Sequence, residues 1–403
     1  AGGSGGSAAT GGQDGADGAE GTGGDGGDGG DAGNAGWNGT RSWAGAIFYE
    51  ANCVTTVSDT TIRNCMAYAD IFRHDPNATG DYVGGDANTG GTGGSGDPAG
   101  SDGAEGLPGA DISSWTISSG GADYYDANCT ADLTRCTLSR NSTEPNAGQW
   151  WGSLDGGGEC YRHDCNVILN NCEFIGNWAG RDGGGQYFDH LCSIEVNDCN
   201  YVDNIAGHDG GGLLGLYENI LNINGSRFIN NSANGFYGSG GGVYGGGVVF
   251  VLTPGFHNDS TITINNSYFV DNSAAFGGGL YWYGDGCEVT ITECFINDNT
   301  ADHGGGLYWS SGAPTIRGCS ISRNTAQGRF ISNIYGPQFG SRFYGGGGGM
   351  FCWTSDAIIE HCFISRNSAS GSGGGAYFGG GASGPVLHLT LPQLNKAQLA
   401  YDE

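Results

Sequence analysis

A six-residue pattern recurs along the chain and restricts its fold more than any other feature. The pattern is a small residue, any residue, an apolar residue, two further residues and Asn, as in CEFIGN at 172–177 and CFINDN at 294–299. Copies that follow one another directly lie 25–27 residues apart, and the longer intervals contain Gly-rich insertions. A unit of this length, repeated without helical periodicity, is typical of a solenoid whose units complete one another's core.

Each copy of the pattern is preceded by alternating β-branched residues, as in CSIEVNDC at 192–199 and STITINNS at 260–267. A second apolar and aromatic segment follows a Gly run, as in GGGLYW at 304–309. Both kinds of segment predict short strands. The expected fold is therefore an all-β parallel β-helix, in which equivalent residues of neighbouring coils stack about 4.8 Å apart.

Three copies also pair a GG-apolar segment with FxxN, namely Phe174 to Asn177, Phe228 to Asn231 and Phe269 to Asn272. This combination resembles the polymorphic outer-membrane protein repeat and, more broadly, bacterial right-handed parallel β-helix repeat proteins. The resemblance covers roughly 41–380 and implies a right-handed solenoid with coils of 25–27 residues at the cell surface or outside the cell. It implies no single activity, because such helices serve as adhesins, polysaccharide lyases and hydrolases, and structural fibres.

The sequence divides into three regions. Residues 1–40 are expected to form a Gly-rich extended segment or linker, with Gly at every third position from 12 to 39. A flexible linker and a packed, polyproline-like strand both remain open for it. The parallel β-helix is expected over 41–385, and a terminal strand or tail over 386–403. Gly-rich insertions interrupt the β-helix near 76–118, 235–260 and 328–349.

The amino-acid composition indicates which partners and which cellular compartment are expected for the protein. The net charge of −28 disfavours binding to nucleic acid or anionic membranes and favours binding of cations. No apolar run approaches the roughly 20 residues that span a bilayer. The 14 Cys, without a CxxC motif, point to an oxidising, extracytoplasmic compartment. Because the sequence starts at Ala1 without a signal peptide, we expect a processed, secreted form.

The Asn that ends each copy of the pattern is expected to form a structural ladder. An amide at an inward turn can both donate and accept hydrogen bonds from coil to coil. The glycines that follow are expected to provide a corner with positive φ. The ladder consists of Asn141, Asn177, Asn204, Asn231, Asn272, Asn299, Asn324 and Asn367.

The cysteines allow two interpretations. The two members of a C-x6-C pair lie too far apart for a disulfide along one strand, but equivalent positions in neighbouring coils lie within disulfide range. The candidate bridges are Cys165 with Cys192, Cys172 with Cys199, and Cys53 with Cys129. The alternative is a stack of reduced, buried thiols that pack as small apolar residues.

Three acids form a possible cation site. Asp155, Asp182 and Asp209 each precede GGG at intervals of 27 residues. Stacked carboxylates would repel by about 3.5 kcal/mol at an effective dielectric constant near 20. Bound Ca²⁺, raised pKa values or outward splaying would relieve this repulsion, and solvated turn acids are the alternative.

Two aromatic residues follow most Gly runs, and strand alternation sends one inward and the other outward. The inner column is expected to be core. The outer column is a candidate surface for stacking on sugar rings or for packing against another subunit. The candidate surface residues are Tyr124, Tyr187, Tyr281, Tyr308 and Tyr377.

These features predict a non-enzymatic structural or adhesive solenoid, which we expect to assemble into filaments or to bind cell-surface glycans. The alternatives are a polysaccharide lyase or hydrolase and a plain glycan-binding module. No residue is assigned as catalytic and no cofactor is expected, apart from the Ca²⁺ considered above. If the chain is a lyase, the acids and bases are to be sought among Arg181, Asp182, His208 and Asp209.

Overall fold

The computed structural model describes ten stretches of the chain, which are residues 41–69, 117–145, 154–233, 247–250, 260–283, 287–328, 346–353, 357–379, 386–388 and 399–401. Two compact units are distinguished, Ala1–Arg41 with Ala69–Ile117, and Ser42–Tyr68 with Ser118–Glu403. Most of the first unit lies outside the described residues, as do the expected N-terminal segment and most of the three insertions. The second unit contains the solenoid.

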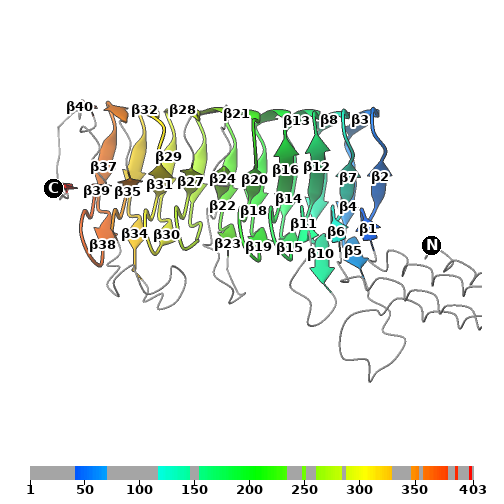
Figure 1. Cartoon of the computed structure of the whole chain (residues 1–403), viewed down its shortest axis with the longest axis horizontal. Coiled ribbons are helices and arrows are strands. Elements are labelled where there is room, and N and C mark those ends of the chain that lie inside the picture. Colours follow the sequence, from blue (N-terminus) through cyan, green and yellow to red (C-terminus); the bar gives the residue numbers. More distant parts are fainter. Residues whose placement is uncertain are drawn as a thin grey trace, which may run out of the picture. The chain divides into compact units, whose positions relative to one another are not determined.

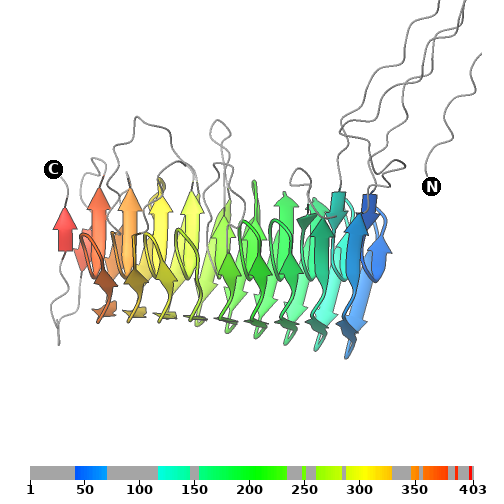
Figure 2. The ribbon, with the colours of Figure 1, turned by 90° about the horizontal axis from the view of Figure 1, so that it is seen from below.

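All regular secondary structure in the described stretches is β-strand, and these stretches contain no helix. The strands form long parallel sheets, an arrangement consistent with a β-solenoid, and they stack in chain order (Figures 1 and 2). Four sheets, which we number 1 to 4, succeed one another around each coil.

Within the described residues, sheet 1 has 11 strands: β2 (Ile47–Tyr49), β7 (Asp123–Tyr125), β12 (Glu159–His163), β16 (Gln186–His190), β20 (Leu213–Gly215), β24 (Val248–Phe250), β27 (Leu280–Tyr283), β31 (Leu307–Ser310), β35 (Met350–Trp353), β39 (Ala376–Gly379) and β41 (Leu399–Tyr401). Sheet 2 has 10 described strands: β3 (Val54–Ser58), β8 (Thr130–Thr134), β13 (Asn166–Asn170), β17 (Ser193–Asn197), β21 (Ile220–Asn224), β25 (Thr261–Asn265), β28 (Glu288–Thr292), β32 (Thr315–Arg317), β36 (Ile358–Glu360) and β40 (Val386–His388).

Sheet 3 has nine described strands: β4 (Thr61–Arg63), β9 (Thr137–Ser139), β14 (Glu173–Ile175), β18 (Asn200–Val202), β22 (Arg227–Ile229), β26 (Tyr268–Val270), β29 (Phe295–Asn297), β33 (Ser320–Ser322) and β37 (Phe363–Ser365). Sheet 4 consists of short strands in two runs, which bridges at Ser273 connect: β5 (Met66–Ala69), β10 (Ser142–Pro145), β15 (Trp178–Ala179), β19 (Ile205–Ala206) and β23 (Ser232–Ala233), then β30 (Thr300–Ala301), β34 (Thr325–Ala326) and β38 (Ser368–Ala369). A small three-stranded sheet contains β1 (Arg41–Trp43), β6 (Ile117–Ser119) and β11 (Leu154–Asp155).

The register shows that each coil stacks residue on residue. Val167 of β13 pairs with Ile194 of β17, which pairs with Leu221 of β21, each 27 positions farther along the chain. The pairing continues across the insertions, since Leu213 of β20 pairs with Val248 of β24. The insertions therefore leave the solenoid register intact.

Alternation within the strands builds the core. In β13 and β17 the second and fourth residues are buried, while the other positions are exposed or half-buried. Each buried Val, Leu or Ile contributes about 1.5–3 kcal/mol of stability. Aromatic rings extend the same core, with Tyr161 stacked between Tyr125 and Phe188 at centroid distances of 4.5 and 4.9 Å.

The corners between strands depend on residues with positive φ. One such residue lies between sheets 2 and 3 in most coils, for example Asn171 with φ 54° and Asp198 with φ 54°. In most described coils, a glycine three positions before the sheet 1 strand has positive φ and turns the chain into that sheet, as at Gly183 with φ 68°. The next glycine is required for a different reason, because a Cβ on Gly184 would lie 2.4 Å from the carbonyl oxygen of Gly211 in the next coil.

An acidic network lies inside the core, which the sequence analysis did not identify. Asp123 and Glu159 occupy the same inward position of β7 and β12, and Gln186 follows in β16. Glu159 Oε2 accepts hydrogen bonds from Tyr161 (2.9 Å) and from Gln186 Nε2 (2.6 Å). Burial raises the pKa of Asp123 to about 7, and burial together with the nearby Asp123 raises that of Glu159 well above its usual range.

We predict that Asp123→Asn stabilises the protein at pH 8 and has little effect at pH 4. An acid whose pKa is raised by folding contributes stability below its unfolded pKa, near 4, which is lost as pH rises towards the folded value near 7. The loss approaches about 1.4 kcal/mol per pH unit in that window. Urea denaturation at both pH values measures the effect, with the exposed Glu195→Gln as control. Equal effects of Asp123→Asn at the two pH values would contradict the prediction.

Candidate functional site

The asparagines that end the repeat pattern form a continuous hydrogen-bonded ladder. From Asn177 onward, the Oδ1 of each accepts two hydrogen bonds from the Asn one coil earlier, from its backbone N–H and its Nδ2, at 2.9–3.1 Å. At the first rung, Asn141 Oδ1 accepts from the backbone N–H of Cys65 at 3.0 Å. The ladder contains Asn141, Asn177, Asn204, Asn231, Asn272, Asn299, Asn324 and Asn367. All but the last are fully buried.

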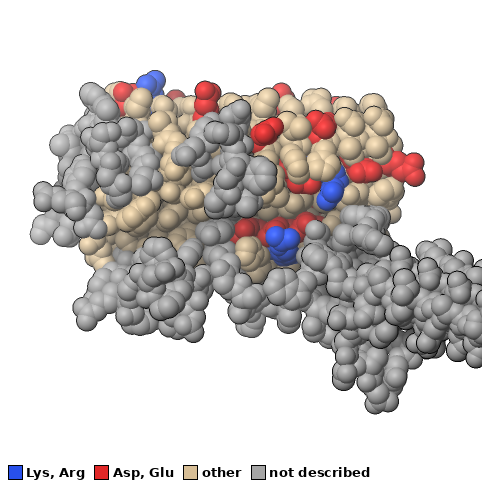
Figure 3. Space-filling model, viewed as in Figure 1, with Lys and Arg blue, Asp and Glu red and all other residues tan. Residues whose placement is uncertain are grey.

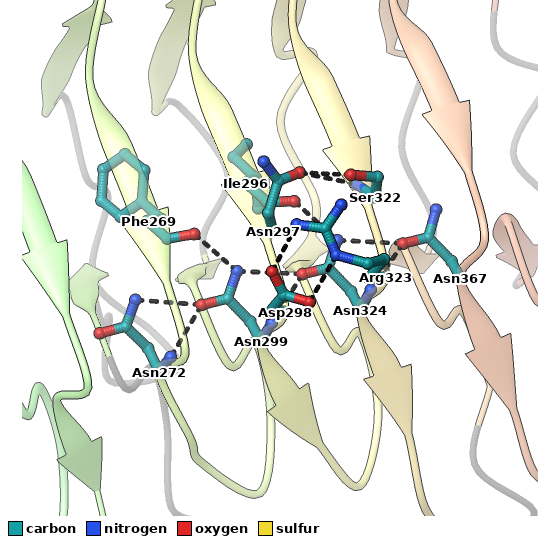
Figure 4. Close-up of polar contacts among 10 residues, drawn as sticks. All are labelled: Phe269, Asn272, Ile296, Asn297, Asp298, Asn299, Ser322, Arg323, Asn324 and Asn367. Carbon is teal, nitrogen blue, oxygen red and sulfur yellow. Dashed lines mark hydrogen bonds and ion pairs between the residues drawn. The ribbon is translucent and has the colours of Figure 1, made fainter.

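Figure 4 shows how one amide uses its hydrogen-bonding capacity. Asn299 Nδ2 donates to the carbonyl oxygen of Phe269 at 2.8 Å and to Asn324 Oδ1 at 3.0 Å. Its Oδ1 meanwhile accepts from both nitrogens of Asn272 at 3.0 Å. The ladder therefore satisfies turn backbone that would otherwise be buried without a partner.

The cysteine columns occur as reduced thiols. All 14 cysteines belong to the described part of the chain, and none forms a disulfide. The thiols instead donate to backbone carbonyls of the preceding coil, such as Cys165 to Asp126 at 3.2 Å and Cys172 to Leu133 at 3.4 Å. The structure thus contains no bond at the candidate bridges Cys165–Cys192, Cys172–Cys199 and Cys53–Cys129.

The outer aromatic column does not form the surface that was expected. Tyr124, Tyr187 and Tyr281 are 3, 6 and 4% exposed, and Tyr308 and Tyr377 are half-buried. These side chains pack on one another, because Tyr124, Tyr187 and Tyr281 belong to one apolar cluster and Tyr281 stacks on Tyr308 with ring centroids 5.2 Å apart. Alternation predicted a column separate from the main core, but its packing leaves little ring surface for sugars.

The acid column is only partly assembled. Asp182 and Asp209 come together, and the imidazole of His208 lies between them, with Nδ1 3.4 Å from Asp182 Oδ1 and 3.0 Å from Asp209 Oδ2. Arg181 Nε lies 3.2 Å from Asp182 Oδ2. Asp155 is buried, and its carbonyl accepts a hydrogen bond from Gly120, but it is not part of this cluster of potential ligands.

Electrostatics define what this cluster can do. Burial alone would lower the pKa of His208, but the adjacent Asp182 and Asp209 carboxylates outweigh it and raise the pKa to about 10. The imidazole is therefore protonated at neutral pH and supplies the positive charge that two stacked carboxylates require. Figure 3 shows basic residues set among acidic ones over the part of the face where β12, β16 and β20 lie.

A second polar cluster was missed by sequence reasoning. His163, Asp189 and His190 place potential ligand atoms within 4.8 Å of one another. The signal was present in the sequence, because His163 and His190 are 27 residues apart and pair in register. This column has only two members, so it shows no period along the sequence.

Comparisons with known proteins supply no relative. No protein-family model, no curated protein and no solved structure matches the chain. Within the described residues there is also no helix long and apolar enough to cross a bilayer.

We predict that Asn299→Ala lowers the free energy of unfolding by about 3–5 kcal/mol, because it leaves several buried polar groups without partners. Asn367→Ala, at the last rung of the ladder, should cost about half as much. Urea denaturation followed by circular dichroism measures both effects. Equal costs for the two substitutions would show that the ladder does not act through stacked hydrogen bonds.

We predict that His208→Gln destabilises the protein by about 1–3 kcal/mol below pH 6.5. This value is smaller than the cost of breaking a fully buried ion pair, because the His208 ring is partly exposed to solvent. A raised folded pKa means that this stability is fully present below 6.5 and is lost as pH rises through about 10. The difference between wild type and variant should therefore shrink above pH 10.

Addition of Ca²⁺ to the wild type provides a complementary measurement. Because His208 and Arg181 already neutralise the carboxylates, millimolar Ca²⁺ should leave the melting temperature unchanged. A rise in melting temperature that Asp182→Asn abolishes would instead support a calcium column.

Proposed function

We propose that the protein is a non-enzymatic structural β-solenoid, with a right-handed path and coils of 25–27 residues, that acts outside the cell and associates end to end. The observation that supports the proposed end-to-end association is the one-sided strand pairing of the first coil. Every coil inside the stack contacts a neighbour on both sides, whereas within the described residues β2, β3 and β4 pair on one side only.

The side chains of the first coil reflect this one-sided contact. Val57 of β3 points inward at the position that Leu133 and Leu169 occupy in the next two coils. Those two residues are fully buried, whereas Val57 is only half-buried. Among the described residues, the first coil therefore presents apolar core and strand edges that pair on one side only.

A second copy of the chain is the partner that fits this end. Parallel strand edges accept a further strand in register, and the last described strands of sheets 1 and 2, β41 and β40, provide edges of the same kind. Head-to-tail contacts of this type do not close into a ring, so they propagate into filaments.

Two rival functions find less support in the geometry. A general base for polysaccharide cleavage must be unprotonated at working pH, and the raised pKa of His208 works against that role. Burial of Tyr124, Tyr187 and Tyr281 removes the surface on which glycan stacking rested. Polysaccharide turnover that is lost in Asp182→Ala would overturn the non-enzymatic proposal.

The extracellular location rests on the acidic composition and on the family resemblance. The 14 cysteines support the same location only where they form disulfides.

We predict that negative-stain microscopy of the purified protein shows filaments at micromolar concentration, and that Val57→Lys abolishes them. An inward-pointing charge on an edge strand opposes the addition of another strand. The matched control is Val54→Lys, the same change on the same strand at a side chain that is 80% exposed. Circular dichroism verifies that both variants are folded.

Isolated particles for the wild type at all concentrations, or filaments that Val57→Lys leaves intact, would contradict end-to-end assembly through the first coil. Light scattering over a concentration series supplies an independent measure of the same association.

A further inference from the structure

Two histidines and one aspartate converge at the ends of β12 and β16. His163 Nε2 lies 3.7 Å from Asp189 Oδ2, and His190 Nδ1 lies 2.6 Å from Asp189 Oδ1. The two imidazole rings meet edge to face, with centroids 4.3 Å apart. No structural role assigned above uses these three side chains.

The solenoid register holds the three groups in place. His163 and His190 are paired residues of adjacent parallel strands, so about 4.8 Å separates their backbones. Asp189 immediately precedes His190 and has a nearly buried side chain, 9% exposed, whereas the two imidazoles are 34 and 40% exposed. The arrangement is therefore an anchored carboxylate flanked by two imidazoles that solvent can reach.

We propose that His163, Asp189 and His190 bind a divalent first-row transition-metal ion, of which Zn²⁺ is the representative. Imidazole and carboxylate are ligands that such ions accept, and three protein ligands leave a fourth position for water. Ligand atoms of a tetrahedral Zn²⁺ site lie about 3.3 Å apart, given bonds of roughly 2.0–2.1 Å. His163 approaches Oδ2 of Asp189 at 3.7 Å and His190 approaches Oδ1 at 2.6 Å, and one ligand atom from each of the three residues lies within 4.8 Å of the others. The side chains therefore have to rotate before one ion contacts all three.

Arg162 supports the carboxylate in this site. Its Nη1 lies 3.7 Å from Asp189 Oδ2, in the position of strand β12 that pairs with Asp189 across the rung. This guanidinium partly offsets the negative charge of Asp189, so the proposed ion is held chiefly by the two imidazoles. A hard cation such as Ca²⁺, which prefers several oxygen ligands, is disfavoured there.

The cluster of Asp182, His208 and Asp209 is a weaker candidate for the same ion. It offers one imidazole, whose Nδ1 already lies within 3.4 Å of both carboxylates. Arg181 also occupies one side of Asp182 at 3.2 Å. An ion there would have to displace the proton on the only imidazole, whereas the His163 cluster offers two imidazoles for one carboxylate.

Isothermal titration of the full chain with Zn²⁺ tests the proposal. We expect one ion per chain, with affinity at least about tenfold lower in His163→Ala and in His190→Ala. Replacement of Zn²⁺ by Co²⁺ should give visible absorption bands that report nitrogen and oxygen coordination, which a purely structural cluster would not produce.

Two control variants identify the source of any binding. His361→Asn changes an exposed histidine and keeps a residue that tolerates the positive φ of that position, so Zn²⁺ affinity should not change. His208→Gln tests the other cluster. Absence of a Zn²⁺ heat signal, or binding that only His208→Gln weakens, would overturn the proposal, and circular dichroism verifies that each variant is folded.

Discussion

The main-chain hydrogen bonding between successive coils is the interaction on which the rest of this structure depends. It fixes the register, so that every side chain lies on its counterpart one coil away. A residue type can therefore repeat in a column only if two copies of its side chain can lie about 4.8 Å apart without strong repulsion. Aliphatic residues and aromatic rings do so by packing, as in the stack of Tyr125, Tyr161 and Phe188. Asn does so because its amide both donates and accepts hydrogen bonds, so each of the eight Asn side chains can bond to the Asn of a neighbouring coil.

Stacked carboxylates repel one another, and this repulsion is relieved in three ways along the chain. Asp123 and Glu159, inside the core, have raised pKa values that favour the protonated form. Asp182 and Asp209 stay paired through a protonated imidazole that lies between them. Asp189 stacks on Arg162 instead of on another acid. The three solutions are protonation, an intercalated cation and alternation of charge, and all occur within a few adjacent coils of one solenoid.

The sequence predicted those parts of the structure that follow from periodicity. The strand alternation, the Asn column and the positive φ at the first glycine of the Gly runs could be predicted, because each repeats in almost every coil. The burial of Tyr187 could not, because it depends on a second apolar cluster outside the main core, which no alternation pattern encodes. The reduced cysteines illustrate a different limit, since stacking within disulfide range permits a bridge without requiring one. His163 and His190 were missed because a column of two members has no visible period.

The short columns are for that reason the more informative ones about function. A column that continues through most coils, like the Asn ladder, has a structural explanation, because the backbone groups at the corner of every coil need hydrogen-bond partners. Arg162, His163, Asp189 and His190 come from only two adjacent strands, β12 and β16. Stacking alone does not require them, because aliphatic or Thr pairs would stabilise the same rungs without the desolvation cost of a nearly buried carboxylate. A polar group kept at such a cost, with imidazoles directed to it from two strands, is more readily explained by a ligand than by the fold.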